Sequence, residues 1–565
     1  MTTTAAYETD DQDVAVALDS LLANVGRVAQ PGVVPGPVLL HWAGALARHP
    51  RATAHRALGL AGELGRIVAG ASDAAPSSRD RRFADPAWSG NPLLRRSVQA
   101  YLAVAEKALQ LVNDAQLDER TEKRVRLLVE NLIEALAPSN SPLLNPSALK
   151  ETIDTGGGNV VRGLKALVKD VSSRPRVPSM VDNSSFEVGR NLGASEGAVV
   201  FRTPVLELIQ YAPTTKKVHE IPLLLVPPTI NKFYVLDLAP GRSTVEYLVG
   251  QGHQVFAISW RNPTARHADW GLDTYINGVL ESLDAVCEIA KVDRAGLYAA
   301  CSGGIISSMA AAHLAGTASS DRLASLTLAV TVLDQAKAGT TSALVDRRRA
   351  DAAIALSKRA GYLDGSLLAE VFAWLRPNDL IWNYWVNNYL LGKKPPAFDI
   401  LSWNADTTRM PAKLHEDFLE LGLANKLVTA GEATALGVPV DLSRVTVDAY
   451  LIGGETDHLT PWQSCYRTTS MLGGKTEFVL STSGHIAALV NPPSNTKSSF
   501  RHSSHTPASA SEFAATAETH QGSWWPHYAE WLGVRSGELV AAPAELGRGR
   551  YQPMAAAPGT YVFDK

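Results

Sequence analysis

The segment GLYAACSGGIISSMAAAHLA, residues 296–315, decides the fold. A short apolar run leads directly to Cys301, and a helical, alanine-rich pattern begins after Gly303 and Gly304. This order of strand, sharp turn and helix is typical of a nucleophile elbow, G-x-[S/C]-x-G, in which a strained turn lifts a reactive side chain above a sheet. Ala299 stands where the pattern has its first glycine. Cys301 is therefore the candidate nucleophile.

Short apolar and β-branched runs separated by turns flank this segment. They predict strands at residues 198–201, 205–211, 221–226, 254–260, 296–300, 325–333, 445–452 and 476–480. Because helical spacing separates the later runs, the pattern predicts an α/β protein with a mostly parallel sheet covered by helices on both faces. Combined with the elbow, it favours the alpha/beta-hydrolase fold. The Ser/Thr-rich residues 494–519 are predicted to form an irregular loop.

The domain organisation follows from where this alternation begins and where it is interrupted. Up to about residue 190 the sequence shows helical segments broken by Pro/Gly/Ser clusters, so residues 1–190 are predicted to form a largely helical N-terminal domain. Residues 191–565 form the predicted catalytic domain, with a helical lid inserted at about 335–444. The insertion contains four tryptophans, Trp374, Trp382, Trp385 and Trp403. We expect them to form the core of the lid rather than to contact an apolar substrate.

Composition and the cysteine count limit the possible partners and compartment. The 565 residues carry 53 Lys and Arg against 56 Asp and Glu, and no long run of one sign suggests nucleic-acid binding. The acidic start MTTTAAYETDDQDVAVALDS does not resemble an export signal, and no apolar stretch reaches the ~20 residues of a transmembrane helix. Three cysteines form no disulfide framework, so we expect a cytoplasmic protein. Cys287 is expected to pack in a core and Cys465 to begin a helix, neither with a catalytic role.

Two further candidate catalytic residues follow predicted strands in the order nucleophile, acid, histidine. Asp457 ends the run VTVDAYLIGGETD, and His485 ends TEFVLSTSGH. Because both lie at strand carboxyl ends, loops can bring them to Cys301. His485 is then the expected general base, and Asp457 orients it and stabilises the imidazolium. His458 is interpreted as support for Asp457 rather than a rival base, and no metal site is predicted.

An oxyanion intermediate at Cys301 requires hydrogen-bond donors. The backbone N–H of Ser302, at the start of the helix, is one candidate. The loop PPTINKFYVLDL, residues 227–238, occupies the usual place of the second donor, and Ile230 and Asn231 are the candidates there. An equally weighted alternative is that the two prolines simply end the strand.

Motifs beyond the predicted strand ends point to one family. They are AACSGG at 299–304, PPTINKFYVLDL at 227–238, VFAISWRNP at 255–263, FDILSWNADTTRMP at 398–411, GGETDHLTPW at 453–462, SGHIAALVNPP at 483–493 and GSWWPHY at 522–528. In this combination the chain resembles the polyhydroxyalkanoate synthases, or poly(3-hydroxyalkanoate) polymerases, from about residue 191 to 533. Family patterns usually have glycine at the position of Ala299. The N-terminal part resembles the family's helical domain only weakly.

The resemblance implies a polymerisation reaction. An acyltransferase would move (R)-3-hydroxyacyl groups from coenzyme A thioesters onto a growing polyester through an acyl-Cys301 intermediate, releasing coenzyme A. The thioester is then the substrate, and no separate cofactor is expected. His485 deprotonates Cys301, and either His485 or Asp457 assists the attacking hydroxyl. The resemblance also implies a homodimer that acts at the surface of cytoplasmic polyester granules.

Two alternatives remain open from the sequence. The same three residues fit a cysteine hydrolase, either a thioesterase or a polyester depolymerase, because they do not specify whether water or a hydroxyl accepts the acyl group. A catalytically silent granule-coating protein is disfavoured because Cys301, Asp457 and His485 are all present. The motifs outside the triad favour the synthase. The length of the acyl chain is not predicted.

Overall fold

The computed structural model describes residues 37–172, 174–335 and 347–565, which divide into two compact units. Residues up to 182 together with 366–397 form the first, here called the helical unit. Residues 183–365 and 398–565 form the second, the sheet unit. The predicted absence of an export signal concerns the first residues of the chain, which lie outside the described ones. In the described part of the chain, no helix is long and apolar enough to cross a membrane.

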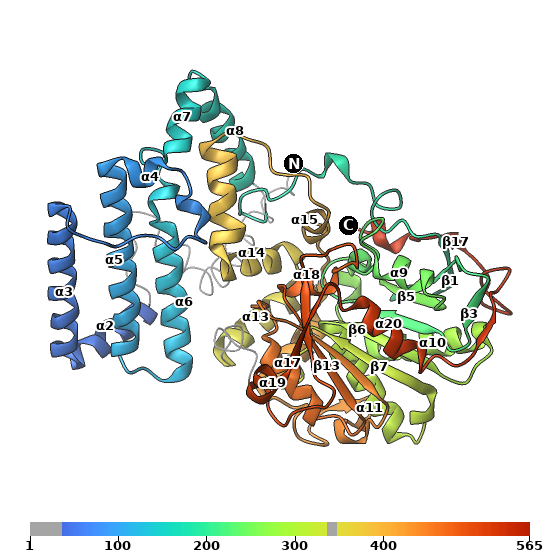
Figure 1. Cartoon of the computed structure of the whole chain (residues 1–565). Coiled ribbons are helices and arrows are strands. Elements are labelled where there is room, and N and C mark those ends of the chain that lie inside the picture. Colours follow the sequence, from blue (N-terminus) through green and yellow to red (C-terminus); the bar gives the residue numbers. More distant parts are fainter. Residues whose placement is uncertain (1–36, 173, 336–346) are drawn as a thin grey trace, which may run out of the picture. The chain divides into compact units, whose positions relative to one another are not determined.

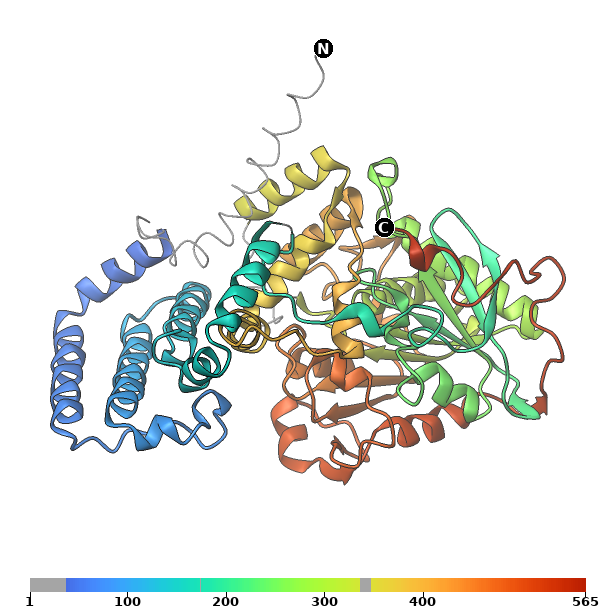
Figure 2. The ribbon, with the colours of Figure 1, turned by 90° about the horizontal axis from the view of Figure 1, so that it is seen from above.

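The helical unit consists mainly of helices. They are α2 (Pro37–Arg48), α3 (Pro50–Ala69), α4 (Ala87–Gly90), α5 (Pro92–Asp114), α6 (Glu119–Ala135), α7 (Pro146–Asp154), α8 (Gly158–Ser172) and α14 (Gly365–Leu375), followed by the π-helical segments η9 (Asn378–Trp382) and η10 (Trp385–Leu390). Asn91 caps α5 and Asp118 caps α6 through their side chains. Helices α3, α5 and α6 run side by side in both ribbon views (Figure 1, Figure 2).

The helical unit differs in extent from the predicted N-terminal domain, because part of the predicted lid belongs to it. Trp385 Nε1 donates a hydrogen bond to the carbonyl of Asn140 at 3.1 Å, and the Tyr389 hydroxyl donates to Asp170 at 2.8 Å. The Tyr389 carbonyl lies so close to Gly163 that a Cβ there would be 2.0 Å away. Residues 366–397 therefore pack with helices far earlier in the sequence. Residues 336–346, at the start of the predicted lid, lie outside the described residues.

The sheet unit is built on one large sheet, which confirms the predicted alpha/beta-hydrolase fold. In the described residues its strand order is β15 (Glu518–Gln521), β14 (Ser499–His502), β13 (Thr476–Ser481), β12 (Ala449–Gly454), β7 (Leu323–Ala329), β6 (Ala295–Ala300), β4 (Leu223–Val226), β5 (Val255–Trp260), β2 (Leu206–Tyr211), β1 (Gly197–Arg202) and β17 (Ala555–Ala556). The strands from β13 to β5 are parallel, and the outer strands on both sides are antiparallel.

Helices cover both faces of this sheet (Figure 1). One apolar core contains side chains of α10 (Leu272–Ala290), α11 (Ser302–Gly316), α16 (Ala412–Leu423), α17 (Trp462–Arg467) and α19 (Ala510–Thr516). A second contains side chains of α9 (Thr244–Gly250), α15 (Asp399–Ala405), α18 (His485–Leu489) and α20 (Trp525–Gly533). Along β6, Leu297 and Ala299 belong to the first core and Tyr298 and Ala300 to the second, as the period of two in a strand requires.

Helix α13 (Arg347–Ala360) and three small two-stranded sheets complete the sheet unit. The strand pairs are β3 (Lys217–His219) with β16 (Leu539–Ala541), β8 (Tyr362–Leu363) with β9 (Met410–Pro411), and β10 (Thr434–Ala435) with β11 (Val438–Pro439). The loop predicted at residues 494–519 is wrong, because this stretch forms β14, α19 and the start of β15. Strand β15 was not predicted because it is polar and exposed along its whole length, and its sequence therefore shows no alternation of apolar and polar residues.

The approach of α11 to the end of β4 depends on the small size of Gly303. A Cβ at this position would lie 2.4 Å from the carbonyl oxygen of Pro227 and 2.6 Å from that of Val226. We expect Gly303→Ala to lower the free energy of unfolding by about 1–3 kcal/mol, as overpacking does. Thermal or urea unfolding measures this loss. Gly250→Ala, at the end of α9 where a Cβ meets nothing within 4 Å, is the matched control, and equal losses in both variants would contradict the packing argument.

Candidate active site

Cys301 lies in a strained turn between β6 and α11, as the elbow pattern predicts. Its backbone has φ +52° and ψ −121°, a conformation that is costly for a residue with a side chain. The Cys301 N–H donates to the carbonyl of Ala329 at 2.9 Å, and the Cys301 carbonyl accepts from Gly304 N–H at 2.9 Å. The surrounding strand and helix therefore hold the thiol at the carboxyl edge of the sheet.

The loop after β7 also supports this turn. Thr331 Oγ1 lies 3.3 Å from the carbonyl oxygen of Cys301 and 3.0 Å from that of Ala329, to both of which it donates. A Cβ on Gly304 would lie 2.0 Å from the same Thr331 oxygen. The second glycine of the elbow is therefore required by close packing.

Asp457 and His485 meet at the same edge of the sheet. Asp457 follows β12, His485 begins α18 after β13, and His485 Nδ1 lies 2.6 Å from Asp457 Oδ2. The other Asp457 oxygen accepts hydrogen bonds from the backbone N–H groups of Leu459 at 2.9 Å and Thr460 at 3.0 Å. The Thr460 hydroxyl donates to Asp457 Oδ2 at 2.5 Å. Four donors thus fix this buried carboxylate.

The electrostatics of this pair favour a protonated imidazole. Burial by itself lowers the pKa of His485, but the adjacent Asp457 carboxylate outweighs burial and raises the pKa to about 10, with a further contribution from a hydrogen bond to Cys301. Burial raises the pKa of Asp457, yet His485 and Thr460 hold it below its usual value. The structure therefore brings the three predicted residues together, with His485 between the thiol and the carboxylate.

The predicted oxyanion residues lie in the loop after β4 and at the start of α11. Ser302 Oγ accepts a hydrogen bond from Thr229 N–H at 2.9 Å, which ties the two segments together. Asn231 has φ +66°, and its side-chain amide donates to the carbonyls of Trp403 and Asn404. That amide is therefore engaged in holding α15. The backbone N–H groups of Ser302, Ile230 and Asn231 stay the predicted donors.

Sequence reasoning missed two threonines that position this site. Thr460 bonds to Asp457 and lies 3.1 Å from His485 Nδ1, and Thr229 bonds to Ser302 and accepts, through its carbonyl, from Thr408 Oγ1 at 3.1 Å. An Asp followed three residues later by Thr is typical of a turn in which the carboxylate accepts hydrogen bonds from backbone N–H groups, so the sequence could have indicated Thr460. No sequence pattern indicates the role of Thr229. The supporting role of His458 stays a prediction.

The other two cysteines do not resemble nucleophiles. Cys287 packs in the apolar core on α10, as predicted, and burial raises the pKa of its thiol to about 11. Cys465 lies on α17, where burial raises the pKa of its thiol well above the usual value. Both thiols are thereby held in the unreactive protonated form.

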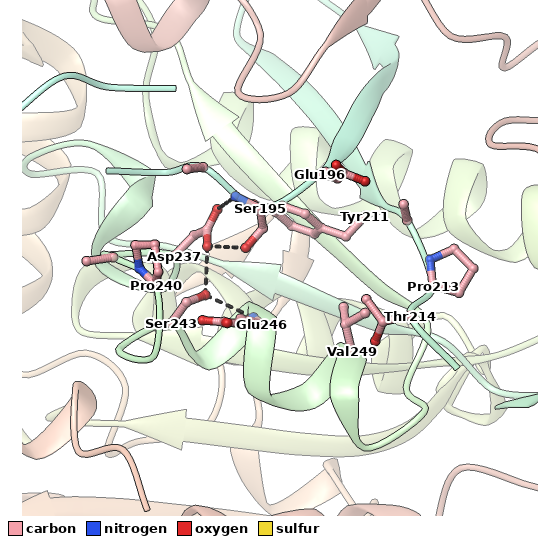
Figure 3. Close-up of a pocket in the computed structure, with 13 residues that line it drawn as sticks. Ser195, Glu196, Tyr211, Pro213, Thr214, Asp237, Pro240, Ser243, Glu246 and Val249 are labelled. Carbon is pink, nitrogen blue, oxygen red and sulfur yellow. Dashed lines mark hydrogen bonds between the residues drawn. The ribbon is translucent and has the colours of Figure 1, made fainter. Parts of the chain in front are cut away.

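A separate pocket of about 220 Å³ lies beside α9 and contains none of the predicted site residues (Figure 3). At its base Asp237 accepts hydrogen bonds from the Ser195 hydroxyl at 2.5 Å and the Ser243 hydroxyl at 2.6 Å. Ser243 also caps α9 by accepting from Glu246 N–H. The buried carboxylate therefore joins the segment before β1 to the start of α9, which is a structural role.

The fold, with Cys301, His485 and Asp457 near one edge of the sheet, places the chain in the class of alpha/beta-hydrolase-fold proteins. A family model described as "alpha/beta hydrolase fold" matches residues 222–492. A second model, "Poly-beta-hydroxybutyrate polymerase (PhaC) N-terminus", matches residues 79–248. The chain is 47% identical to poly(3-hydroxyalkanoate) polymerase 1 of Ectopseudomonas oleovorans, over 89% of this chain and 90% of that one. The chain therefore belongs to the poly(3-hydroxyalkanoate) polymerase family.

Two further relatives support this assignment. Poly(3-hydroxyalkanoate) polymerase 2 of Ectopseudomonas oleovorans is 45% identical over 92% of both chains. The poly(3-hydroxyalkanoate) polymerase subunit PhaC of Cupriavidus necator is 40% identical over 88% of this chain and 85% of the relative. The similarity thus spans most of both units rather than the sheet unit alone.

Asp457→Asn tests the electrostatic coupling at this site. Removing the carboxylate leaves burial as the main influence, so we expect the pKa of His485 to fall from about 10 toward or below its ordinary value. NMR titration of labelled histidine measures the shift. We also expect activity to fall by about 10²–10⁴-fold, because His485 loses its orientation. Asp284→Asn, an exposed carboxylate on α10, is the control, and an unchanged His485 pKa in Asp457→Asn would contradict the coupling.

Proposed function

We propose that this chain polymerises (R)-3-hydroxyacyl coenzyme A thioesters into a polyester, with release of coenzyme A, through a covalent acyl-Cys301 intermediate. One observation carries the proposal. A buried Asp457–His485 pair contacts a cysteine at a nucleophile elbow, in a chain that is 40–47% identical to three polymerases over most of its length. Those relatives also disfavour the hydrolase alternative.

The first half of the reaction is a thioester exchange. In the thiolate–imidazolium form of the pair the Cys301 proton resides on His485, and the thiolate attacks the carbonyl carbon of the substrate. The bond to Cys301 Sγ forms first and gives a tetrahedral oxyanion. The bond from that carbon to the coenzyme A sulfur then breaks, and His485 gives the proton to the leaving thiolate. One thioester replaces another, so the acyl group stays activated. The backbone N–H groups of Ser302 and of Ile230 or Asn231 are the proposed donors to the oxyanion.

The second half forms the ester bond. The 3-hydroxyl of another acyl group attacks the Cys301 thioester, the carbon–oxygen bond forms, and the carbon–sulfur bond to Cys301 breaks. We assign proton removal from this hydroxyl to His485, because both Asp457 oxygens already accept hydrogen bonds from four donors. The scheme uses only groups of this chain and the thioester substrate. It requires no separate cofactor or metal.

An apolar face on α8 supports action at a polyester granule in the cytoplasm. Five of its side chains are each more than half exposed and recur at helical spacing along one face, namely Val160, Val161, Leu164, Val168 and Val171. Ile153 on α7, 80% exposed, is a further exposed apolar side chain of the helical unit. A polyester surface is apolar, so such a face lowers the free energy of adsorption. Family resemblance further supports a homodimer, which light scattering of the purified protein tests.

Cys301→Ala tests the proposed nucleophile. We expect coenzyme A release from (R)-3-hydroxyacyl thioesters of about four and about eight carbons to fall by about 10³-fold or more, since a triad fails without its nucleophile. Cys287→Ala, which removes a buried thiol, serves as the control and retains activity. Chromatography of the wild-type product distinguishes polymer from free hydroxy acid. Free acid, or unchanged release in Cys301→Ala, would overturn the proposal.

Leu164→Lys combined with Val168→Lys tests the α8 face. We expect binding to polyester particles to weaken at least tenfold, because transfer of one such side chain from water is worth roughly 1.5–3 kcal/mol. Co-sedimentation measures the binding. Leu58→Lys with Val68→Lys changes two exposed apolar residues of α3 and is the matched control. Coenzyme A release from soluble substrate stays unchanged in both variants, and equal particle binding by both would argue against the α8 face.

A further inference from the structure

A cluster of metal-ligand side chains lies apart from Cys301, on three segments of the sheet unit. Glu477 is on β13, His502 ends β14 and His527 is on α20. His502 Nε2 lies 3.0 Å and His527 Nε2 lies 3.3 Å from Glu477 Oε1, and one ligand atom from each residue lies within 4.8 Å of the others. Tetrahedral zinc, with ligand bonds of about 2.0–2.2 Å, holds neighbouring ligand atoms about 3.3–3.5 Å apart. The two distances to Glu477 are near this value, so the three residues are close enough to share one ion.

Nε2 of each imidazole lies beside Glu477 Oε1. His527 Nδ1 lies 2.8 Å from the hydroxyl of Tyr450, a fully buried residue, so Nδ1–H can donate to that oxygen and leave the Nε2 lone pair toward Glu477. Metal-bound histidines are typically oriented by such a second hydrogen bond. His502 Nε2 is buried, and its 3.0 Å contact with Glu477 lacks the alignment of a hydrogen bond within the described chain.

The cluster also has an open side. Glu477 and His502 line a surface cavity of about 460 Å³ together with Ser503 and His505. Three protein ligands would thus leave one coordination position for water or another small ligand. Arg535, a cation that lines the same cavity, is paired with Asp448 at 2.8 Å, which reduces its repulsion of a bound cation.

We propose that Glu477, His502 and His527 bind one divalent transition-metal ion of the zinc class. Two imidazoles and one carboxylate form a ligand set that suits Zn²⁺ and its neighbours rather than Mg²⁺ or Ca²⁺. The ion joins β14 and α20 to β13, the strand that leads to His485. It therefore stabilises the carboxyl-terminal part of the sheet unit. This inference is independent of the proposed polymerisation chemistry.

Calorimetric titration of the full-length, chelator-treated protein with Zn²⁺ tests the site. The Cys301→Ser background removes the one half-buried thiol that could bind zinc elsewhere among the described residues. We expect saturable binding of one ion, weakened at least about tenfold by Glu477→Gln and by His502→Ala. His505→Ala, an exposed histidine of the same cavity, is the matched control and binds normally. The proposal is overturned if the Cys301→Ser protein, which is the parent of these variants, does not bind Zn²⁺, or if binding survives both ligand substitutions.

Two further measurements separate metal binding from a folding defect. Zn²⁺ should raise the midpoint of thermal unfolding of the parent and leave that of Glu477→Gln unchanged, because a ligand that binds only the folded state stabilises it. Tyr450→Phe keeps the ring but removes the oxygen beside His527, and we expect its affinity for Zn²⁺ to fall by about 10–100-fold. Parent-like affinity in Tyr450→Phe, or an equal zinc-induced shift in Glu477→Gln, contradicts the assignment.

Discussion

The positive φ of Cys301 is the constraint on which the rest of the sheet unit depends. Such a backbone costs of order 1–3 kcal/mol and persists only where its surroundings enforce it. Here the enforcement comes from three directions: the strand β6, the helix α11 packed through Gly303 against the end of β4, and Thr331 packed against Gly304. Two of these contacts require glycine, at Gly303 and Gly304, because a Cβ there would clash with neighbouring atoms. The elbow can therefore be recognised from a short stretch of sequence.

The buried Asp457–His485 pair complements this turn. A carboxylate that accepts four hydrogen bonds keeps its charge despite burial, and that charge is what stabilises an imidazolium next to it. In the proposed mechanism, this charge gives a proton that leaves the thiol a favourable destination. Burial raises the thiol pKa of Cys287 and of Cys465, and the Asp457 carboxylate raises that of Cys465 further.

How much the sequence could predict depended on the range of the interactions. The proximity of Cys301, Asp457 and His485 could be predicted because strand ends in a parallel sheet share an edge, and local patterns place all three residues at strand ends. The packing of residues 366–397 with the helical unit was missed, because Trp385 and Tyr389 bond to Asn140 and Asp170, more than 200 residues away. The cluster of Glu477, His502 and His527 was not predicted, because its members lie on two strands and a helix, and the segment that forms β14 was expected to be a loop.

Chain connectivity gives the helical unit a direct link to the active-site loops. The chain passes between the units three times, and the last passage, at residues 397 and 398, leads straight into α15. There Trp403 Nε1 donates to the carbonyl of Lys232 at 2.7 Å, and Asn231 donates to the carbonyl of Trp403. The loop that carries two of the candidate oxyanion donors is thus anchored by the segment that follows the helical unit.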